Sequence, residues 1–555
     1  MRRFTLIFFL VVLGCPFVAL ADGPVTPQKS SISSDDQGDP MLKAMLAELK
    51  RSEQELRLGD MQRPYYIDYQ VTDLQDYVAD ASLGALRSDT SNIGRLVRVV
   101  VRIGDYKQDS YYAEGTGSLE VMPIEDNEIA LRRQLWLATD KAYKAALSGY
   151  TQKQAALKNV ESESDVADFS KEDPVQSVHD TVKLDVDLDQ WKQIIRHTSA
   201  LFRRDPSLES SDALFHFRIL NRYFVNTEGT VTRSGKAVYD FAFEGSTQAS
   251  DGMRVDRSHG YVVTKADELP KPEQIEKDAQ ELISSFPLLA KAPVMEDDYH
   301  GPVLFSADAS TALFERLLTR NILGIRPDLG NPARTSGDFA SYYKSRVLPD
   351  FLTVVDDPHA KKVDDQTLAG SYDVDDEGVQ AHSVTVIDKG VLANYLVDRE
   401  PIRDFPHSNG RGRTALAGAP HPQISNLIVK ANNGLSFDDM KNKLIQMCKD
   451  QGRPYGYYVE TTGEHLNPRL LWRIYSNDRH MELVRGAVFN QLDTRALRSD
   501  IIAAGSDRYV YNRSEPLPSS IVAPSLLFDD LELQRANRTR EKLPSYPAPS
   551  LTATK

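Results

Sequence analysis

The sequence predicts a protein of two domains that mixes helices with strands. A chain of 555 residues is longer than one hydrophobic core usually serves. Helical and strand patterns alternate up to about residue 290, whereas strand and turn patterns dominate after it. An acidic segment with several prolines, residues 287–302, separates the two parts. We therefore place the domains at residues 39–295 and 296–540.

The composition is typical of a soluble globular protein, with 41% hydrophobic and 26% charged residues. The net charge of −14 would repel the phosphates of nucleic acids and of anionic membranes. Beyond the N-terminal segment, no stretch approaches the ~20 apolar residues of a membrane-spanning helix. We expect neither nucleic-acid binding nor a membrane span.

Residues 1–21 have the pattern of a signal peptide. Arg2 and Arg3 precede the apolar run Phe4–Leu13, and Ala19-Leu20-Ala21 supplies the small residues that signal peptidase needs. We expect cleavage after Ala21 and a periplasmic or secreted protein.

Lipid attachment at Cys15 is a weaker alternative to cleavage after Ala21. In either case Cys448 has no second cysteine in the folded part of the chain, so we expect no internal disulfide. Residues 22–38 predict a flexible linker, and the Pro/Ser/Thr-rich residues 541–555 predict a disordered tail.

The first domain is predicted to contain three helices and several strands. Asp39 caps a helix that ends near Gly59, and the other helical patterns cover 127–157 and 273–286. Strand patterns cover 65–72, 95–103 and much of 214–244. Arg98 and Arg102 lie on the same face of one strand, which we expect to be exposed to solvent.

The second domain is predicted to consist mainly of strands. Exceptions are the helical patterns 308–321 and 436–451, the second of them capped by Ser436. Residues 371–398 predict an acidic turn followed by a hairpin, which reverses at Asp388-Lys389-Gly390.

No local motif for metal or nucleophilic catalysis stands out. The zinc-protease motif HExxH is absent, and the eleven histidines lack the spacing of a helical metal site. Cys448 lies on a predicted helix, where a core position is expected. Ser341–Lys344 matches S-x-x-K, but the companion KTG and SDN boxes are missing.

The run Asp375, Asp376, Glu377, Gly378 holds three adjacent carboxyl groups. Such a group could supply paired carboxylates for acid–base chemistry. A solvated turn is the interpretation that we favour, because turns tolerate this composition. His382 and His421 are expected to be structural or surface histidines.

Segments 48–56, 64–69, 131–147 and 226–229 are similar to the secreted branch of the TldD/PmbA family, which comprises zinc metalloproteases and their inactivated homologues. Five later segments, in order, resemble the same family. They are DDEG (375–378), KGVLANYL (389–396), SNGRGR (408–413), ELVRG (482–486) and IVAPSLLFDDLEL (521–533). The resemblance implies an α+β fold with an N-terminal α+β domain and a C-terminal β-rich, barrel-like domain.

The resemblance implies that members of this family bind zinc through an HExxxH helix and a late cysteine, and that peptides enter a cleft between the domains. Here Phe314 and Thr319 stand at the two histidine positions, and only Glu315 is retained. No cysteine follows Cys448. We therefore expect no zinc and no other cofactor. Glu315 would be the residual catalytic group, and an ion pair with Arg316 or Arg320 is the alternative role for it.

The resulting hypothesis is an inactive homologue that acts as a partner subunit or as a peptide-binding module in proteolysis. It would form a homodimer, or a heterodimer with a TldD/PmbA paralogue, and would bind a peptide near Asp375–Gly378. Two alternatives stay open. One is an active hydrolase that uses Glu315, His382, His421 or the DDEG carboxylates, and the other is a structural or assembly protein of the cell envelope.

Overall fold

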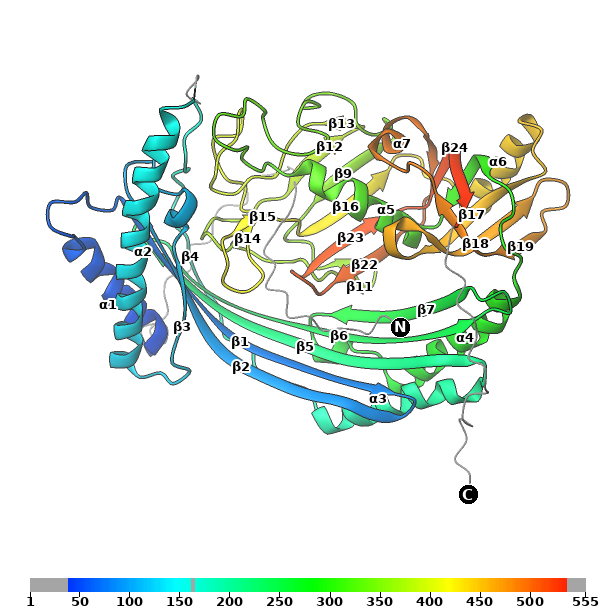
Figure 1. The fold of residues 1–555 in the computed structure, drawn as a ribbon, viewed down its shortest axis with the longest axis horizontal. Coiled ribbons are helices and arrows are strands. Elements are labelled where there is room, and N and C mark those ends of the chain that lie inside the picture. The colour runs from blue at the N-terminus through cyan, green and yellow to red at the C-terminus, as the bar shows by residue number, and fades with distance from the viewer. Residues whose placement is uncertain (1–37, 161–164, 537–555) are drawn as a thin grey trace.

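The computed structural model describes residues 38–160 and 165–536, which form two domains (Figure 1). The predicted signal peptide, nearly all of the linker and the predicted tail lie outside these residues. Within the described parts, no helix is both long and apolar enough to cross a membrane.

The first domain is a curved seven-stranded sheet with four helices. Its strand order is β3-β2-β1-β5-β6-β4, and β7 pairs with β6. The strands are β1 (Tyr66–Ser82), β2 (Ala85–Arg102), β3 (Ser118–Val121), β4 (Gln176–Val178), β5 (Leu208–Asn226), β6 (Val231–Gln248) and β7 (Arg254–Val263). The helices are α1 (Pro40–Glu55), α2 (Glu128–Leu157), α3 (Leu188–Leu201) and α4 (Pro272–Lys291).

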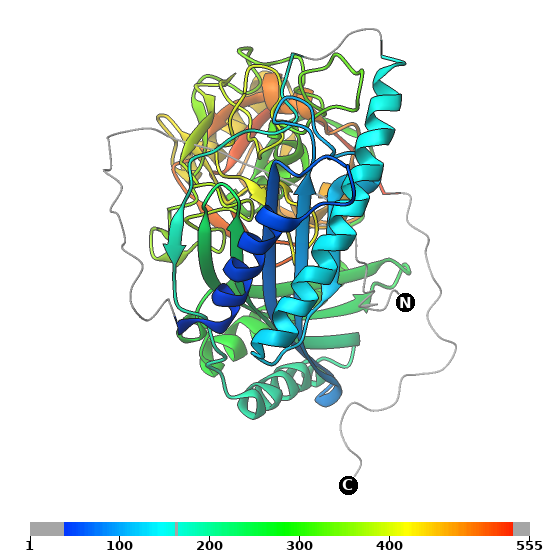
Figure 2. The same ribbon diagram turned by 90° about the vertical axis from the view of Figure 1, so that its left-hand side faces the viewer.

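Alternation along the strands gives this sheet one apolar and one polar face. The odd-numbered residues of β1, such as Tyr69 and Tyr77, pack in two apolar clusters beneath the helices. Helices α1 and α2 cover one end of that outer face, and α3 and α4 cover the other (Figures 1 and 2). Because side chains alternate across a strand, the even-numbered residues point to the opposite, inner face. This concave face curves around the second domain (Figure 1).

The second domain is built from two main sheets. One has the order β13-β12-β9-β16-β23-β22, and the other has the order β19-β18-β17-β8-β24-β20 with β21 beside β24. The strands are β8 (Tyr299–Phe305), β9 (Leu352–Asp356), β10 (Lys362–Val363), β11 (Gln366–Thr367), β12 (Val384–Asp388), β13 (Val391–Leu392), β14 (Gly412–Arg413), β15 (His421–Pro422), β16 (Asn426–Ala431), β17 (Tyr455–Thr462), β18 (Pro468–Tyr475), β19 (Met481–Val484), β20 (Ala487–Phe489), β21 (Ile501–Ala504), β22 (Tyr509–Arg513), β23 (Ser519–Ala523) and β24 (Leu526–Arg535).

The helices of this domain are α5 (Ala307–Leu317), α6 (Phe437–Asp450) and α7 (Thr494–Ser499). Helix α5 contributes to the same apolar core as both main sheets, whereas α6 packs against β8 in a separate cluster. Both main sheets are open, so the barrel-like expectation is corrected to a layered arrangement of open sheets.

Most predicted elements are confirmed, but four helices differ from the prediction. Helix α4 continues through Pro287 to Lys291, and the short helix α7 was not predicted. The helical pattern 308–321 begins one residue earlier, after the N-cap Ser306, and gives way to a 3-10 turn, Thr319–Ile322. Helix α3 was not predicted at all. The hairpin turn at Lys389 and Gly390 is confirmed, and both residues have positive φ angles, 45° and 78°.

A buried arginine from the second domain joins the two domains. Arg399 is 1% exposed, and its guanidinium lies 2.8 Å from Glu228 and donates to the carbonyl oxygen of Ser170. The same guanidinium lies 3.9 Å from the centre of the Phe169 ring. A buried cation needs this degree of compensation, because removing it from water is costly.

We predict that Arg399→Met destabilises the protein by about 3–5 kcal/mol, because Glu228 would remain buried without its cation. Urea denaturation would measure the loss. The matched control is Arg508→Met, which removes an exposed pair with Asp364 and should cost less than about 1 kcal/mol. Equal costs for the two variants would contradict a special role for Arg399.

Candidate functional site

Helix α5 carries the residues at which the family resemblance implies zinc ligands. The hydroxyl of Ser306 accepts the N–H of Ala309 at 2.9 Å and donates to the carbonyl oxygen of Glu460 at 2.6 Å, so the start of the helix is tied to β17. Phe314 is completely buried in the core of the second domain. Its ring therefore packs against apolar side chains.

Glu315 lies on the other side of α5 and is partly exposed. One of its carboxylate oxygens is 3.0 Å from Nη1 of Arg513 on β22, which replaces the expected partners Arg316 and Arg320. Thr319 lies beyond the end of α5, and its hydroxyl donates to the carbonyl oxygen of Glu315 at 2.5 Å. Its oxygen is thus engaged with its own helix.

These residues do not fit a zinc ion. Phenylalanine has no lone pair to donate, and zinc sites in proteins use Cys, His, Asp and Glu. Cys448 lies on α6 in the separate apolar cluster, and burial raises the pKa of its thiol to about 11, which disfavours the thiolate. Across residues 38–160 and 165–536, no three His, Cys, Asp or Glu side chains are grouped to hold a metal.

A cavity of about 410 Å³ lies between the inner face of the first sheet and the loops of the second domain. Strands β5 and β6 form one wall, and residues 371–376, 413–415 and 514–518 form the other. The last of these loops directly follows Arg513, which pairs with Glu315. Glu315 therefore contacts a residue next to the cavity lining. Pockets of about 300–1,000 Å³ are typical of ligand sites.

The lining of this cavity carries more positive than negative charge. Six lining residues are lysine or arginine and four are aspartate or glutamate, although the whole chain has a net charge of −14. The cations are Arg218, Arg222, Arg233, Lys236, Lys361 and Arg413; the acids are Asp373, Asp375, Asp376 and Glu515.

Asp376 lies between two of these cations. Its carboxylate is 2.5 Å from Nη1 of Arg222 and 3.4 Å from Nε of Arg413, and it accepts the N–H of Thr414 at 2.8 Å. Burial alone would raise the pKa of Asp376, but the two guanidinium groups outweigh it and hold the pKa below its ordinary value. Asp376 therefore stays ionised.

Asp375 fixes the shape of the turn. Its carboxylate accepts N–H groups from Glu377, Val379 and Gly412, each at 2.9 Å. Burial nevertheless raises its pKa to about 7. Because Asp375 is only 4% exposed, the expectation of a solvated turn is wrong.

Gly378 allows the turn to lie against the first domain. It has a φ of 78°, and a Cβ atom at this position would lie 2.5 Å from the Phe224 ring on β5. Any side chain would therefore push the turn away from the sheet.

Glu377 and Asp398 bury two further carboxyl groups behind the turn. Glu377 accepts the backbone N–H of Arg399 at 2.8 Å. Burial and the neighbouring Asp375 raise the pKa of Glu377 to about 8. For Asp398, burial and the nearby carboxyl groups of Glu377 and Glu400 raise the pKa well above its ordinary value. These carboxyl groups are therefore at the boundary between domains and not in solvent.

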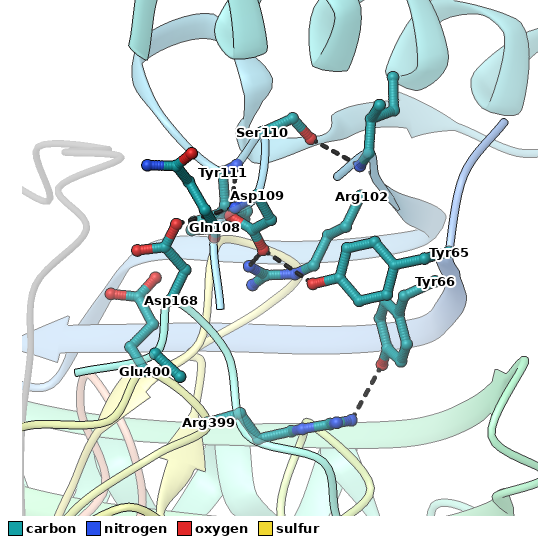
Figure 3. Close-up of polar contacts among 12 residues, drawn as sticks. Tyr65, Tyr66, Arg102, Gln108, Asp109, Ser110, Tyr111, Asp168, Arg399 and Glu400 are labelled. Atoms are coloured by element: carbon teal, nitrogen blue, oxygen red, sulfur yellow. Dashed lines mark hydrogen bonds and ion pairs between the residues drawn. The ribbon is translucent and has the colours of Figure 1, made fainter. Parts of the chain in front are cut away.

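A second polar network closes the end of the interface near Arg399 (Figure 3). Asp109 lies 2.6 Å from Nη1 of Arg102 and accepts the hydroxyl of Tyr65 at 3.0 Å. Arg98 and Arg102 were expected on an exposed face, but they are 7% and 3% exposed. The face is polar but covered, because the rings of Tyr111 and Phe169 lie over Arg102 and Arg98 donates to the Tyr111 hydroxyl.

The two histidines lie near the loops of the second domain. Burial lowers the pKa of both His382 and His421, and His421 pairs with Arg413 in the short β14–β15 ladder. The catalytic role suggested for them stays a prediction. Sequence reasoning missed Arg222 and Lys236, although their even numbers in strands with buried odd-numbered aromatics marked the inner face.

Comparison with known proteins agrees with this arrangement. Residues 299–535 match the family model of the PmbA/TldA metallopeptidase C-terminal domain. The fold is similar to that of TldE from Thermococcus kodakarensis, with a TM-score of 0.59 and 14% identity over 88% of this chain and 99% of that one. The family match lies in the second domain, and the structural likeness shows that the fold is shared.

Two archaeal relatives of the PmbA/TldD-like chain share short stretches with it. It is 28% identical over 123 residues to a metalloprotease of Archaeoglobus fulgidus and 32% identical over 96 residues to a metalloprotease of Methanocaldococcus jannaschii. These stretches cover 22% and 17% of this chain, and 25% and 20% of the relatives. The chain thus aligns with only about a quarter or a fifth of each relative.

The raised pKa of Glu377 predicts a pH-dependent stability. Between the unfolded pKa of about 4.3 and the folded value of about 8, the folded chain holds a proton that the unfolded chain has lost. Stability should therefore fall as the pH rises through this window. Replacing Glu377 by Gln removes that titration, so the loss of unfolding free energy between pH 5 and pH 7 should shrink by about 1–3 kcal/mol.

Urea denaturation at the two pH values would measure the effect. Glu53→Gln, at an exposed position on α1, is the control and should leave the pH dependence unchanged. A profile for Glu377→Gln as steep as that of the parent protein would contradict the assignment.

Proposed function

We propose that this protein is a member of the PmbA/TldD family without zinc, which binds peptides and does not cleave them. The observation that carries the proposal is the chemistry of α5. A ring buried in the core and a hydroxyl bonded to its own helix stand where imidazoles would be needed, and Glu315 is neutralised by Arg513. A carboxylate without a metal leaves a water molecule near its bulk pKa, so hydrolysis by this route should fail.

The cavity between the domains supports the peptide-binding part of the proposal. It has the volume of a small-ligand site, apolar and charged walls, and contributions from both domains. The DDEG turn borders it through Asp375 and Asp376. The cleft can keep its shape whatever residues stand on α5, because Phe314, Glu315 and Thr319 do not line it.

The biological setting follows from the same proposal. The chain would act as a partner subunit or peptide-binding module, as a homodimer or as a heterodimer with a paralogue that has an intact HExxxH helix. The sequence of residues 1–21 supports export to the periplasm or outside the cell, as in a secreted branch of the family.

Metal analysis and a peptidase assay test the proposal. The purified protein should contain far less than one equivalent of zinc, and it should not cleave peptides in a chelator-sensitive way. Glu315→Gln keeps a hydrogen-bond acceptor for Arg513, so it should leave peptide binding unchanged and alter stability by less than about 1 kcal/mol.

One equivalent of zinc together with chelator-sensitive cleavage that Glu315→Gln abolishes would overturn the proposal. The same assays on a mixture with a paralogue test the partner role, because an activity that appears only in the mixture is the expected result.

A further inference from the structure

We propose that the cavity between the domains is a site for the C-terminal carboxylate of a peptide, held by Lys236 and Arg413. This inference rests on the proposed peptide-binding function and names the chemical group that the site would recognise. It is carried by the positions of the two cations, by the incomplete neutralisation of their charge and by the apolar walls beside them.

Lys236 projects from β6 into the cavity with no acidic partner. Its ammonium donates to two main-chain carbonyl oxygens of the second domain, Ala369 at 2.5 Å and Ser371 at 2.9 Å. Within residues 38–160 and 165–536, no carboxylate lies within 4.0 Å of it in an ion pair. An ammonium group has three donors, so one donor is left for a ligand.

Arg413 faces the same cavity from the second domain. It is 6% exposed, and its guanidinium lies 4.0 Å from the centre of the Tyr372 ring. Its ion-pair partner among the described residues is Asp376, which it shares with Arg222. Because one carboxylate serves two guanidinium groups, one positive charge is left over here in addition to that of Lys236.

A carboxylate can neutralise this surplus charge. Guanidinium groups bind carboxylates in a planar, two-point geometry, and burial strengthens such charge-assisted hydrogen bonds. Phe224, Val238 and Leu517 line the same cavity and are at most 6% exposed, so they offer an apolar surface beside the two cations. That combination suits a terminal carboxylate with an apolar side chain, because the cations can hold the carboxylate and the apolar wall can hold the side chain.

The ionisation of Lys236 supports the same conclusion. Burial lowers the pKa of its ammonium to about 7, with Arg413 and Arg222 as further causes and Asp376 opposing them. A bound carboxylate would add a negative charge beside these groups and favour the protonated lysine. Binding should therefore be tighter at pH 6 than at pH 8.5.

A pair of peptides that differ only at the C-terminus tests the inference. We suggest N-acetylated Ala-Ala-Ala-Leu with either a free carboxylate or a C-terminal amide, titrated into the full mature chain by calorimetry. The free acid should bind at least tenfold more tightly than the amide. Lys236→Met should reduce the affinity for the acid to near that for the amide and remove its pH dependence.

Two controls separate the effect from misfolding and from other ligands. Lys362→Met, an exposed residue of β10 outside the cavity lining, should leave both affinities unchanged. Inorganic phosphate and N-acetylleucine should compete weakly. Competition by N-acetylleucine as strong as that by the peptide would overturn the peptide assignment in favour of a small carboxylic acid.

The experiment distinguishes failure of the carboxylate inference from failure of the proposed peptide binding. Equal binding of acid and amide would overturn the carboxylate inference and leave peptide binding intact. If neither peptide binds, nor any member of a pool that varies the four residues, the proposed function itself fails. Unchanged affinity of Lys236→Met for the acid would overturn the role of that lysine. The circular dichroism spectrum of the variant shows whether it has folded, so a loss of affinity can be told apart from misfolding.

Discussion

The contact between the two domains depends on the position of the buried Arg399 guanidinium. It contacts three groups of the first domain, namely Glu228, the Phe169 ring and the carbonyl oxygen of Ser170. Its backbone N–H is accepted by Glu377, so the same residue also holds the DDEG turn. A cation buried this deeply is tolerated only when its partners are all in place, which limits the domains to one relative position.

The polar inner face of the first sheet explains much of the remaining architecture. In most sheets that pack on helices, the second face meets water. Here that face carries Arg98 and Arg102, which side chains of the same domain cover, and Arg222 and Lys236, which donate to carbonyl oxygens of the second domain. The cost of burying these charges is offset where carboxylates and main-chain carbonyl oxygens lie opposite them, and the cavity is the part of the interface in which this compensation is incomplete.

In the proposed function, the candidate site separates two properties that occur together in a metallopeptidase. Peptide recognition needs a cleft with suitable charges and apolar surface, and the walls of the cavity have both. Hydrolysis needs ligands that point into the cleft, and α5 instead directs Phe314 into the core. Substitutions on α5 that favoured the apolar core would remove zinc chemistry without disturbing the walls of the cavity, which belong to other elements.

What could be predicted from the sequence was local. The helices α1, α2, α4 and α6, the hairpin turn at Lys389-Gly390 and the loss of donor atoms at Phe314 and Thr319 follow from periodicity, turn chemistry and residue type. Helix α3 was missed although the sequence carries its signals, because Asp187 caps it and Trp191 and Ile195 lie four residues apart on its buried face.

The environment of each charged group could not be predicted, because it depends on segments that are distant in the sequence. Asp375–Glu377 has the composition of a solvated turn, yet Phe224, more than 150 positions earlier, covers it. Lys236 and Arg413 come from different domains and face one cavity only when the sheet curves around the second domain. Burial and the net charge of a site are sums over neighbours in space, so tertiary structure alone decided them.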